Sequence, residues 1–139
     1  NFNLYLQEKG LDVSDVVRQA SALYKQGISL SDSGEIDAAM DKYEEAFETY
    51  PYMFEAMDNK AFLKMDQGDY TGAIGDFQRG LEYSSGSDSA TALISIGECY
   101  LKLNKYKKAV RFIEQGLEEQ DSEVGRRLLA LAKQRLQSE

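Results

Sequence analysis

The chain has 139 residues, with 24 acidic and 16 basic side chains and a formal net charge of −8. It holds no histidine, which excludes an imidazole base, a Ser-His-Asp or Cys-His relay and a zinc site with histidine ligands. Its single cysteine, Cys99, excludes an intrachain disulfide. The net acidity argues against binding to nucleic-acid phosphates, and no apolar run is long enough to span a membrane.

The chain begins at Asn1 rather than at a methionine and shows no signal peptide. We interpret it as a trimmed or excised segment that need not include any targeting sequence, so its compartment is unknown and the cytoplasm is only the default. Its length fits a single domain with a buried core.

Acidic and basic residues are segregated along the sequence. Residues 31–80 hold 12 acidic and 4 basic side chains, whereas residues 101–139 hold 6 acidic and 9 basic ones. We expect most of these groups to lie on solvated faces of helices. If the chain forms units stacked along one axis, the same asymmetry predicts a field that orients a charged partner.

The first elements are two amphipathic helices. Apolar or small residues share one helical stripe over residues 15–30, at Val16, Val17, Ala20, Leu23, Tyr24, Gly27 and Leu30. Ser14 is the expected N-cap, and residues 31–34 predict a turn. A second stripe follows, with Ile36, Ala39, Met40, Tyr43, Ala46 and Phe47, and Pro51 ends it. Residues 15–50 therefore predict a helix–turn–helix unit.

This unit recurs twice. The segments 34–39, 68–73 and 104–109 align as GEIDAA, GDYTGA and NKYKKA, with offsets of 34 and 36 residues. An internal period of this length indicates stacked repeats. Small residues in the first helix, with Ala39, Ala73 and Ala109 in the second, predict a close crossing within each pair.

These residues resemble the tetratricopeptide repeat family, whose 34-residue unit is a pair of antiparallel helices. The resemblance implies an all-α fold, a right-handed superhelical stack of helix pairs forming a solenoid. It divides the chain into an N-terminal arm (1–19), three repeats (20–53, 54–87 and 90–123) and a capping helix (124–139).

The sequence departs from the family pattern at several positions. Lys60 and Lys64 stand where apolar residues are usual, and we expect Phe62 and Leu63 to compensate from adjacent positions. Residues 84–89 replace a proline turn and are two residues longer, which predicts a longer, more mobile loop. We expect Cys99 to be a buried thiol. Residues 1–13 are expected either to form a short helix over the first repeat or to enter a groove.

No residue pattern indicates catalysis, and we expect a non-catalytic protein with no cofactor and no metal. Neighbouring carboxylates such as Glu44 and Glu45 point apart on a helix. Gly75 and Gly80 lie within a helical pattern rather than in a phosphate-binding loop.

The family resemblance instead implies recognition of another protein on a concave face lined by the first helix of each repeat. This groove has an apolar centre, acidic borders, one asparagine and one lysine. Its predicted residues are Tyr24, Ile28, Asp32, Glu55, Asp58, Asn59, Phe62, Met65, Asp66, Ile94, Glu98, Leu101 and Lys102. We expect its ligand to be a peptide or amphipathic helix that is apolar and carries basic residues. The alternative is that the N-terminal segment or the capping helix covers these apolar groups.

One subset of the family grips the C-terminal carboxylate of chaperone tails with Lys, Asn, Asn, Lys and Arg. The matching positions here hold Tyr24, Ile28, Asn59, Thr91 and Ser95, of which only Asn59 agrees. We therefore predict no binding of EEVD-ended tails, because the acidic borders would repel a carboxylate.

Three other hypotheses remain open at this point. The chain could self-associate into a homo-oligomer through its groove and N-terminal arm. It could be a secretion-type chaperone, although no motif singles this out. A basic turn could contact an acidic protein or an anionic surface through Lys102, Lys105, Lys107, Lys108 and Arg111.

Overall fold

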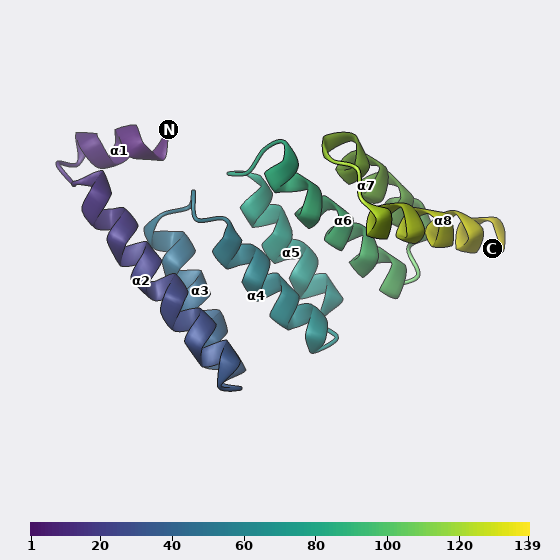
Figure 1. Ribbon diagram of the computed structural model, residues 1–139, viewed down its shortest axis with the longest axis horizontal. Helices are drawn as coiled ribbons and strands as arrows, with labels where there is room; N and C mark the ends of the chain where they lie inside the picture. Colours follow the sequence, from purple (N-terminus) through teal and green to yellow (C-terminus); the bar gives the residue numbers. More distant parts are fainter.

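The computed structural model describes residues 1–139, and the chain is built entirely of helices (Figure 1). This confirms the all-α class. The helices are α1 (Phe2–Glu8), α2 (Val13–Asp32), α3 (Ile36–Thr49), α4 (Glu55–Asp66), α5 (Tyr70–Leu81), α6 (Ser87–Lys102), α7 (Tyr106–Glu119) and α8 (Glu123–Gln137). None of them is both long enough and apolar enough to cross a bilayer.

Helices α2 to α7 form three antiparallel pairs that stack side by side, with α8 packed on α7 (Figure 1). Three residues join the helices of each pair, at 33–35, 67–69 and 103–105. Each turn contains a residue with positive φ, which is +83° at Gly34, +81° at Gly68 and +60° at Asn104. Glycine and asparagine tolerate this left-handed conformation, which is why they occupy the first position of the recurring segment.

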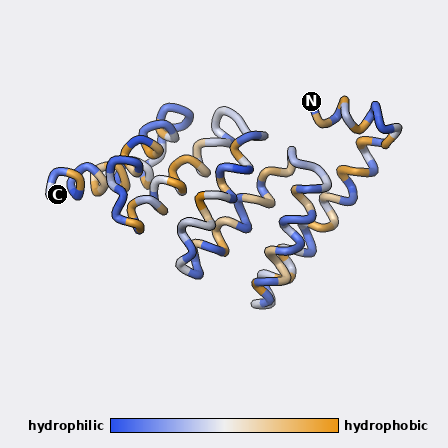
Figure 2. The backbone as a smooth tube through the Cα atoms, turned by 180° about the vertical axis from the view of Figure 1, so that it is seen from behind, coloured by the Kyte–Doolittle hydropathy of each residue, from blue (hydrophilic) through white to orange (hydrophobic).

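Within a pair, the helices approach closely because small residues face large ones. A Cβ on Gly27 would lie 2.6 Å from Tyr43 Cε1, and a Cβ on Gly97 would collide with Ile113. Ala39, Ala73 and Ala109 are fully buried. Orange and blue segments alternate along the helices in Figure 2, because each helix turns one apolar face inward. The core therefore runs between the helices along the whole stack.

Two predicted boundaries are wrong. Helix α2 begins at Val13 rather than after Ser14, because Asp12 Oδ1 accepts a hydrogen bond from the Ser14 amide at 2.8 Å and caps the helix. The linker between α5 and α6 comprises residues 82–86, which equals the five residues of the linker 50–54 between α3 and α4. The additional residues lengthen α6, which has 16 residues where α4 has 12, instead of lengthening the loop.

The N-terminal segment forms α1 and packs on the linker 50–54. The Phe2 ring lies 6.0 Å from the Tyr50 ring, and the Phe2 amide donates to Tyr52 Oη at 3.2 Å. Tyr50 Oη donates to Asn3 Oδ1 at 2.9 Å. Of the two alternatives for this segment, the structure shows the short helix, which leaves the groove open.

Candidate functional site

Two hollows lie between α2 and α4, on either side of Ile28. The first, of about 400 Å³, is lined by Ser21, Tyr24, Lys25, Ile28, Met53 and Glu55. The second, of about 390 Å³, is lined by Ile28, Ser31, Asp32, Tyr43, Asn59, Phe62 and Leu63. Ile28 itself is 40% exposed. We call these two hollows and Ile28 the α2–α4 groove.

Polar and aromatic contacts hold this groove open in one shape. Asn59 on α4 donates its side-chain amide to Tyr24 Oη on α2 at 3.0 Å. The Tyr24 ring packs on Tyr43 of α3, with ring centroids 5.8 Å apart. Asn59 therefore bridges two repeats, and Tyr24 presents a ring whose position is set before any ligand arrives.

The predicted anchors on α4 are part of the core as well as of the groove. Phe62 packs edge-on against the buried Phe77 at 5.1 Å, and Met65 packs against the same cluster. Both side chains keep part of their surface exposed. They can contact a ligand only while supporting the second repeat, so mutations at these two positions report on folding as well as on binding.

The predicted acidic residues fall into two environments. Asp32, Glu55 and Asp66 are exposed to solvent at the edges of the first two repeats. Asp58 instead lies against α5, where a Cβ on Gly80 would be 3.4 Å from its Oδ1. Burial, with a smaller contribution from the negative charge of Glu55, raises the pKa of Asp58 to about 7.

The third repeat differs, because the structure places two predicted groove residues in the core. Ile94 and Leu101 are each only 9% exposed. Ile94 fills the space left by Gly116 of α7 and Gly125 of α8, and Leu101 shares a cluster with Ala132 of α8. The capping helix therefore covers them, which is the alternative interpretation of the sequence for this repeat. Lys102 stays exposed, and Glu98 lines a separate cavity beside α8.

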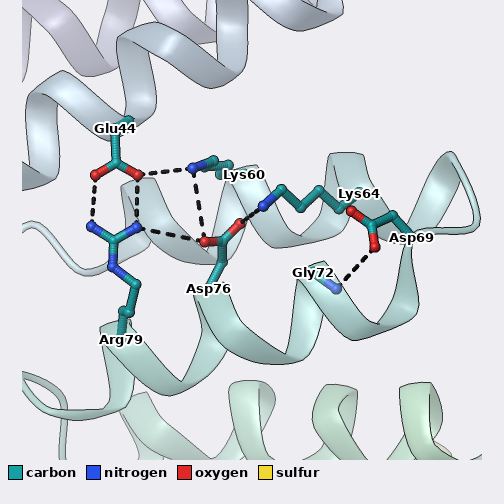
Figure 3. A network of polar contacts seen from close by, with 7 residues as sticks. All are labelled: Glu44, Lys60, Lys64, Asp69, Gly72, Asp76 and Arg79. Atoms are coloured by element: carbon teal, nitrogen blue, oxygen red, sulfur yellow. Dashed lines mark hydrogen bonds and ion pairs between the residues drawn. The ribbon is translucent and has the colours of Figure 1, made fainter.

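A network of ionic contacts lies at the junction of α3, α4 and α5 and was not predicted (Figure 3). Arg79 binds Glu44 through two hydrogen bonds of 2.6 and 2.7 Å, and Lys60 Nζ lies 2.8 Å from the same carboxylate. Lys64 Nζ lies 2.8 Å from Oδ2 of Asp76, a side chain on α5 that is only 4% exposed as a residue. The two lysines that depart from the family pattern are thus accommodated by carboxylates, while Phe62 packs beside them as expected.

The charges in this network control its protonation. Hydrogen bonds from Arg79 hold the pKa of Glu44 well below its usual range, against the opposing effect of burial and with help from Lys60. The same contact raises the pKa of Arg79. A signal was present in the sequence, since Lys60 and Lys64 needed counterions, but nothing in the spacing identified Glu44 and Asp76 as their partners.

Cys99 is fully buried, and burial raises the pKa of its thiol to about 12, as expected for an unreactive core residue. No cluster of three or more histidine, cysteine or carboxylate side chains could hold a metal ion. The basic residues Lys107, Lys108 and Arg111 lie exposed on α7. Lys108 lies over the ring of Tyr100 and Arg111 lies over the ring of Phe112, so both cations already make cation–π contacts within the chain.

Several curated proteins have sequences similar to this chain, and each alignment spans only part of the relative's length. Tetratricopeptide repeat protein 36 of Danio rerio is 29% identical over 99 residues, spanning 70% of this chain and 52% of the relative. Its human counterpart is 31% identical over 74 residues, spanning 53% of this chain and 39% of the relative. The photosystem I assembly protein Ycf3 of Prochlorococcus marinus strain MIT 9303 is 29% identical over 97 residues, spanning 68% and 55%. The chain thus spans about half the length of the curated relatives it matches.

Solved structures and family models agree on the fold. The first tetratricopeptide domain of Spaghetti (RPAP3), bound to the HSP90 peptide SRMEEVD, superposes with a TM-score of 0.77 at 21% identity, over 86% of this chain and 94% of that one. The N-terminal domain of STI-1 from C. elegans also gives 0.77, at 18% identity, over 87% and 97%. Family models described as tetratricopeptide repeat match residues 21–51 and 52–118. The chain therefore belongs to the tetratricopeptide repeat family, whose members are generally non-catalytic protein-interaction modules.

Proposed function

We propose that the chain binds a peptide or amphipathic helix of a partner protein in the α2–α4 groove, and that this ligand is apolar with basic residues. The observation that carries the proposal is Ile28, which is exposed between two hollows whose linings include Asp32 and Glu55. Apolar ligand side chains would enter the hollows, where burial of apolar surface supplies most of the affinity.

The acidic residues give the groove its preference for basic ligands. Asp32 and Glu55 line the hollows and are exposed, so their attraction for a cation is screened by water and salt. Their contribution is to the rate and orientation of encounter more than to affinity. Lys25 is the only basic residue that lines either hollow.

Acidic chaperone tails do not fit this groove. The Spaghetti domain was solved with the peptide SRMEEVD, but the residues that would meet such a tail here are Tyr24, Ile28, Asn59, Thr91 and Ser95, none of which is cationic. We propose that the chain does not use this class of ligand. Fluorescence anisotropy with labelled SRMEEVD should show no saturation at low micromolar protein. A submicromolar dissociation constant would contradict the proposal.

The groove is tested by selecting binders from a library of random 16-residue peptides displayed on phage, at physiological salt. Wild type is expected to enrich peptides with apolar residues and at least one lysine or arginine. Ile28→Asn should abolish their binding, because a polar amide in place of the isoleucine removes the apolar surface between the hollows.

The matched control is Leu4→Asn, which makes the same kind of change at an exposed apolar residue of α1, outside the groove. Its binding should equal that of wild type. Both variants should keep the wild-type circular dichroism spectrum, since both side chains are exposed. Enriched peptides that bind Ile28→Asn as tightly as wild type would place the binding surface elsewhere.

A further inference from the structure

The capping helix forms one wall of a third cavity. This cavity, of about 360 Å³, lies between α6, the linker 120–122 and the first turns of α8. Its lining includes Ile94, Ser95 and Glu98 of α6, Asp121 of the linker, and Val124 and Leu128 of α8. Val124 is 62% exposed, so α8 presents apolar surface toward this space as well as packing on α7. We call it the α6–α8 cavity.

The polar groups in the α6–α8 cavity are not equally available. Asp121 is already paired with Arg126. Glu98 forms no ion pair, although Lys102 lies one helical turn further along α6. Ser95 is only 8% exposed as a residue, and its hydroxyl takes part in no hydrogen bond within the chain. The cavity thus contains one unpaired carboxylate and one unpartnered hydroxyl.

Apolar side chains lie beside these two groups. Ile94 on α6 and Val124 and Leu128 on α8 form an apolar part of the lining. A lysine or arginine side chain has the same two-part character, since its aliphatic stem packs on apolar surface while its cation seeks an oxygen ligand. An acidic side chain would meet the uncompensated charge of Glu98, and a purely apolar one would leave that carboxylate desolvated without a partner.

We propose that the α6–α8 cavity is a subsite for one lysine or arginine side chain of the bound peptide, with its stem on Ile94, Val124 and Leu128 and its cation on Glu98. The inference rests on the proposed function, because the peptide bound in the α2–α4 groove delivers the side chain. A 16-residue extended peptide spans about 50 Å, and we expect it to run from α2 across α4 and α6 to α8.

The test compares peptide pools selected, from the same phage library, by wild type, Glu98→Gln and Glu8→Gln. Glutamine keeps the size of the side chain but removes its charge. Glu8 lies exposed on α1, far along the sequence from the cavity and without an ion pair, so it matches the change in net charge. Wild type and Glu8→Gln should share a lysine or arginine preference at one position, and Glu98→Gln should lose the preference at that position alone.

One selected peptide is then synthesised with lysine or norleucine at that position, and its affinity is measured by calorimetry. Norleucine keeps the aliphatic stem and removes the cation. For wild type the replacement should weaken binding about ten-fold, the lower end expected of a charge-assisted hydrogen bond and more than a screened surface charge gives. For Glu98→Gln it should change binding by less than about two-fold, because glutamine carries no charge to attract the cation.

The outcomes separate this inference from the proposed function. Peptides that lose binding to Ile28→Asn but keep their basic preference with Glu98→Gln would overturn the subsite and leave the groove intact. Equal losses on norleucine replacement for wild type and Glu98→Gln would overturn it as well. If wild type enriches no peptide, both proposals fail together.

Discussion

The two junctions between successive helix pairs both bury apolar side chains, Phe47 and Met57 among them in the first, but only the first adds a network of charges. Where α3 meets α4, Glu44 and Lys60 face each other, and α5 contributes Asp76 and Arg79. Where α5 meets α6, fully buried Phe77, Ile96 and Cys99 form an apolar cluster. We call these the ionic junction and the apolar junction. The comparison teaches that a helix repeat tolerates buried charge when the counterions come from both neighbouring helices.

The two junctions contribute to the free energy of unfolding in different ways. The apolar junction gains stability with each methylene that it removes from water, so losing atoms costs both transfer energy and a cavity. In the ionic junction, attraction between charges offsets a desolvation cost of similar size, so the net gain is small while the loss of one partner is expensive. Substitutions in and around these two junctions test this difference.

The largest effect is expected in the apolar junction. Phe77→Ala should lower the free energy of unfolding by about 3–5 kcal/mol, because the ring is fully buried and packs on Phe62. Urea denaturation followed by circular dichroism measures the change. Tyr5→Ala serves as a control, since its ring is about half exposed on α1 and should cost far less. A loss below 1 kcal/mol for Phe77→Ala would mean that the apolar junction is not the main source of stability.

In the ionic junction, removing the charge of Asp76 alone should cost more than removing Lys60, Lys64 and Asp76 together. Asp76→Asn should destabilise the fold by about 2–3 kcal/mol, because Lys64 loses its 2.8 Å partner in a partly buried site. A triple variant with leucine at positions 60, 64 and 76 leaves the Glu44–Arg79 pair intact and should lie within about 1 kcal/mol of wild type. Urea titrations of both variants provide the comparison. A triple variant less stable than Asp76→Asn would contradict this account.

Two carboxyl groups, Glu44 in the ionic junction and Asp58 beside α5, should make the stability respond to pH in opposite directions. The pKa of Glu44 is lowered by folding, so its contribution to stability is present above its unfolded pKa and is lost as acid protonates it. Asp58 forms no ion pair or hydrogen bond, and its pKa of about 7 means that folding is penalised as pH rises from the unfolded value of about 4 toward 7.

Asp58→Asn should therefore stabilise the protein at pH 8 by about 1–2 kcal/mol, after allowance for the partial exposure of the carboxyl, and should have little effect at pH 4. Urea midpoints measured from pH 4 to pH 8 test this. Glu44→Gln is the opposite case, with its penalty largest near neutral pH and smaller in acid. An Asp58→Asn effect that does not vary with pH would show that the carboxyl titrates normally.

The smallest effect is expected for an ion pair outside both junctions. Arg127 and Glu123 lie 2.6 Å apart on α8, but both side chains are mostly exposed. Glu123→Gln should change the free energy of unfolding by less than about 0.5 kcal/mol, because solvent screens the pair. The change in thermal midpoint against wild type gives the measurement. A cost comparable to that of Asp76→Asn would mean that burial does not set the value of ion pairs in this chain.

The architecture could be predicted from the residue pattern alone. The helix pairs could be predicted from the repeat period, from the small residues at the helix crossings and from the turn residues Gly34, Gly68 and Asn104. The burial of Cys99 could be predicted in the same way. The groove was predictable in part, since Ile28 and Tyr24 line hollows between α2 and α4. These features follow from steric rules that act over a few residues.

Features that depend on contacts between distant segments could not be predicted in this way. Ile94 and Leu101 occupy groove positions by spacing, but α8 buries them, because a helix that ends the stack must cover the apolar face of the repeat before it. The ion pairs of Lys60 with Glu44 and of Lys64 with Asp76 depend on how α3, α4 and α5 pack in space. Ion pairing and burial depend on distances between side chains of different helices, and the spacing of residues along one helix does not specify those distances.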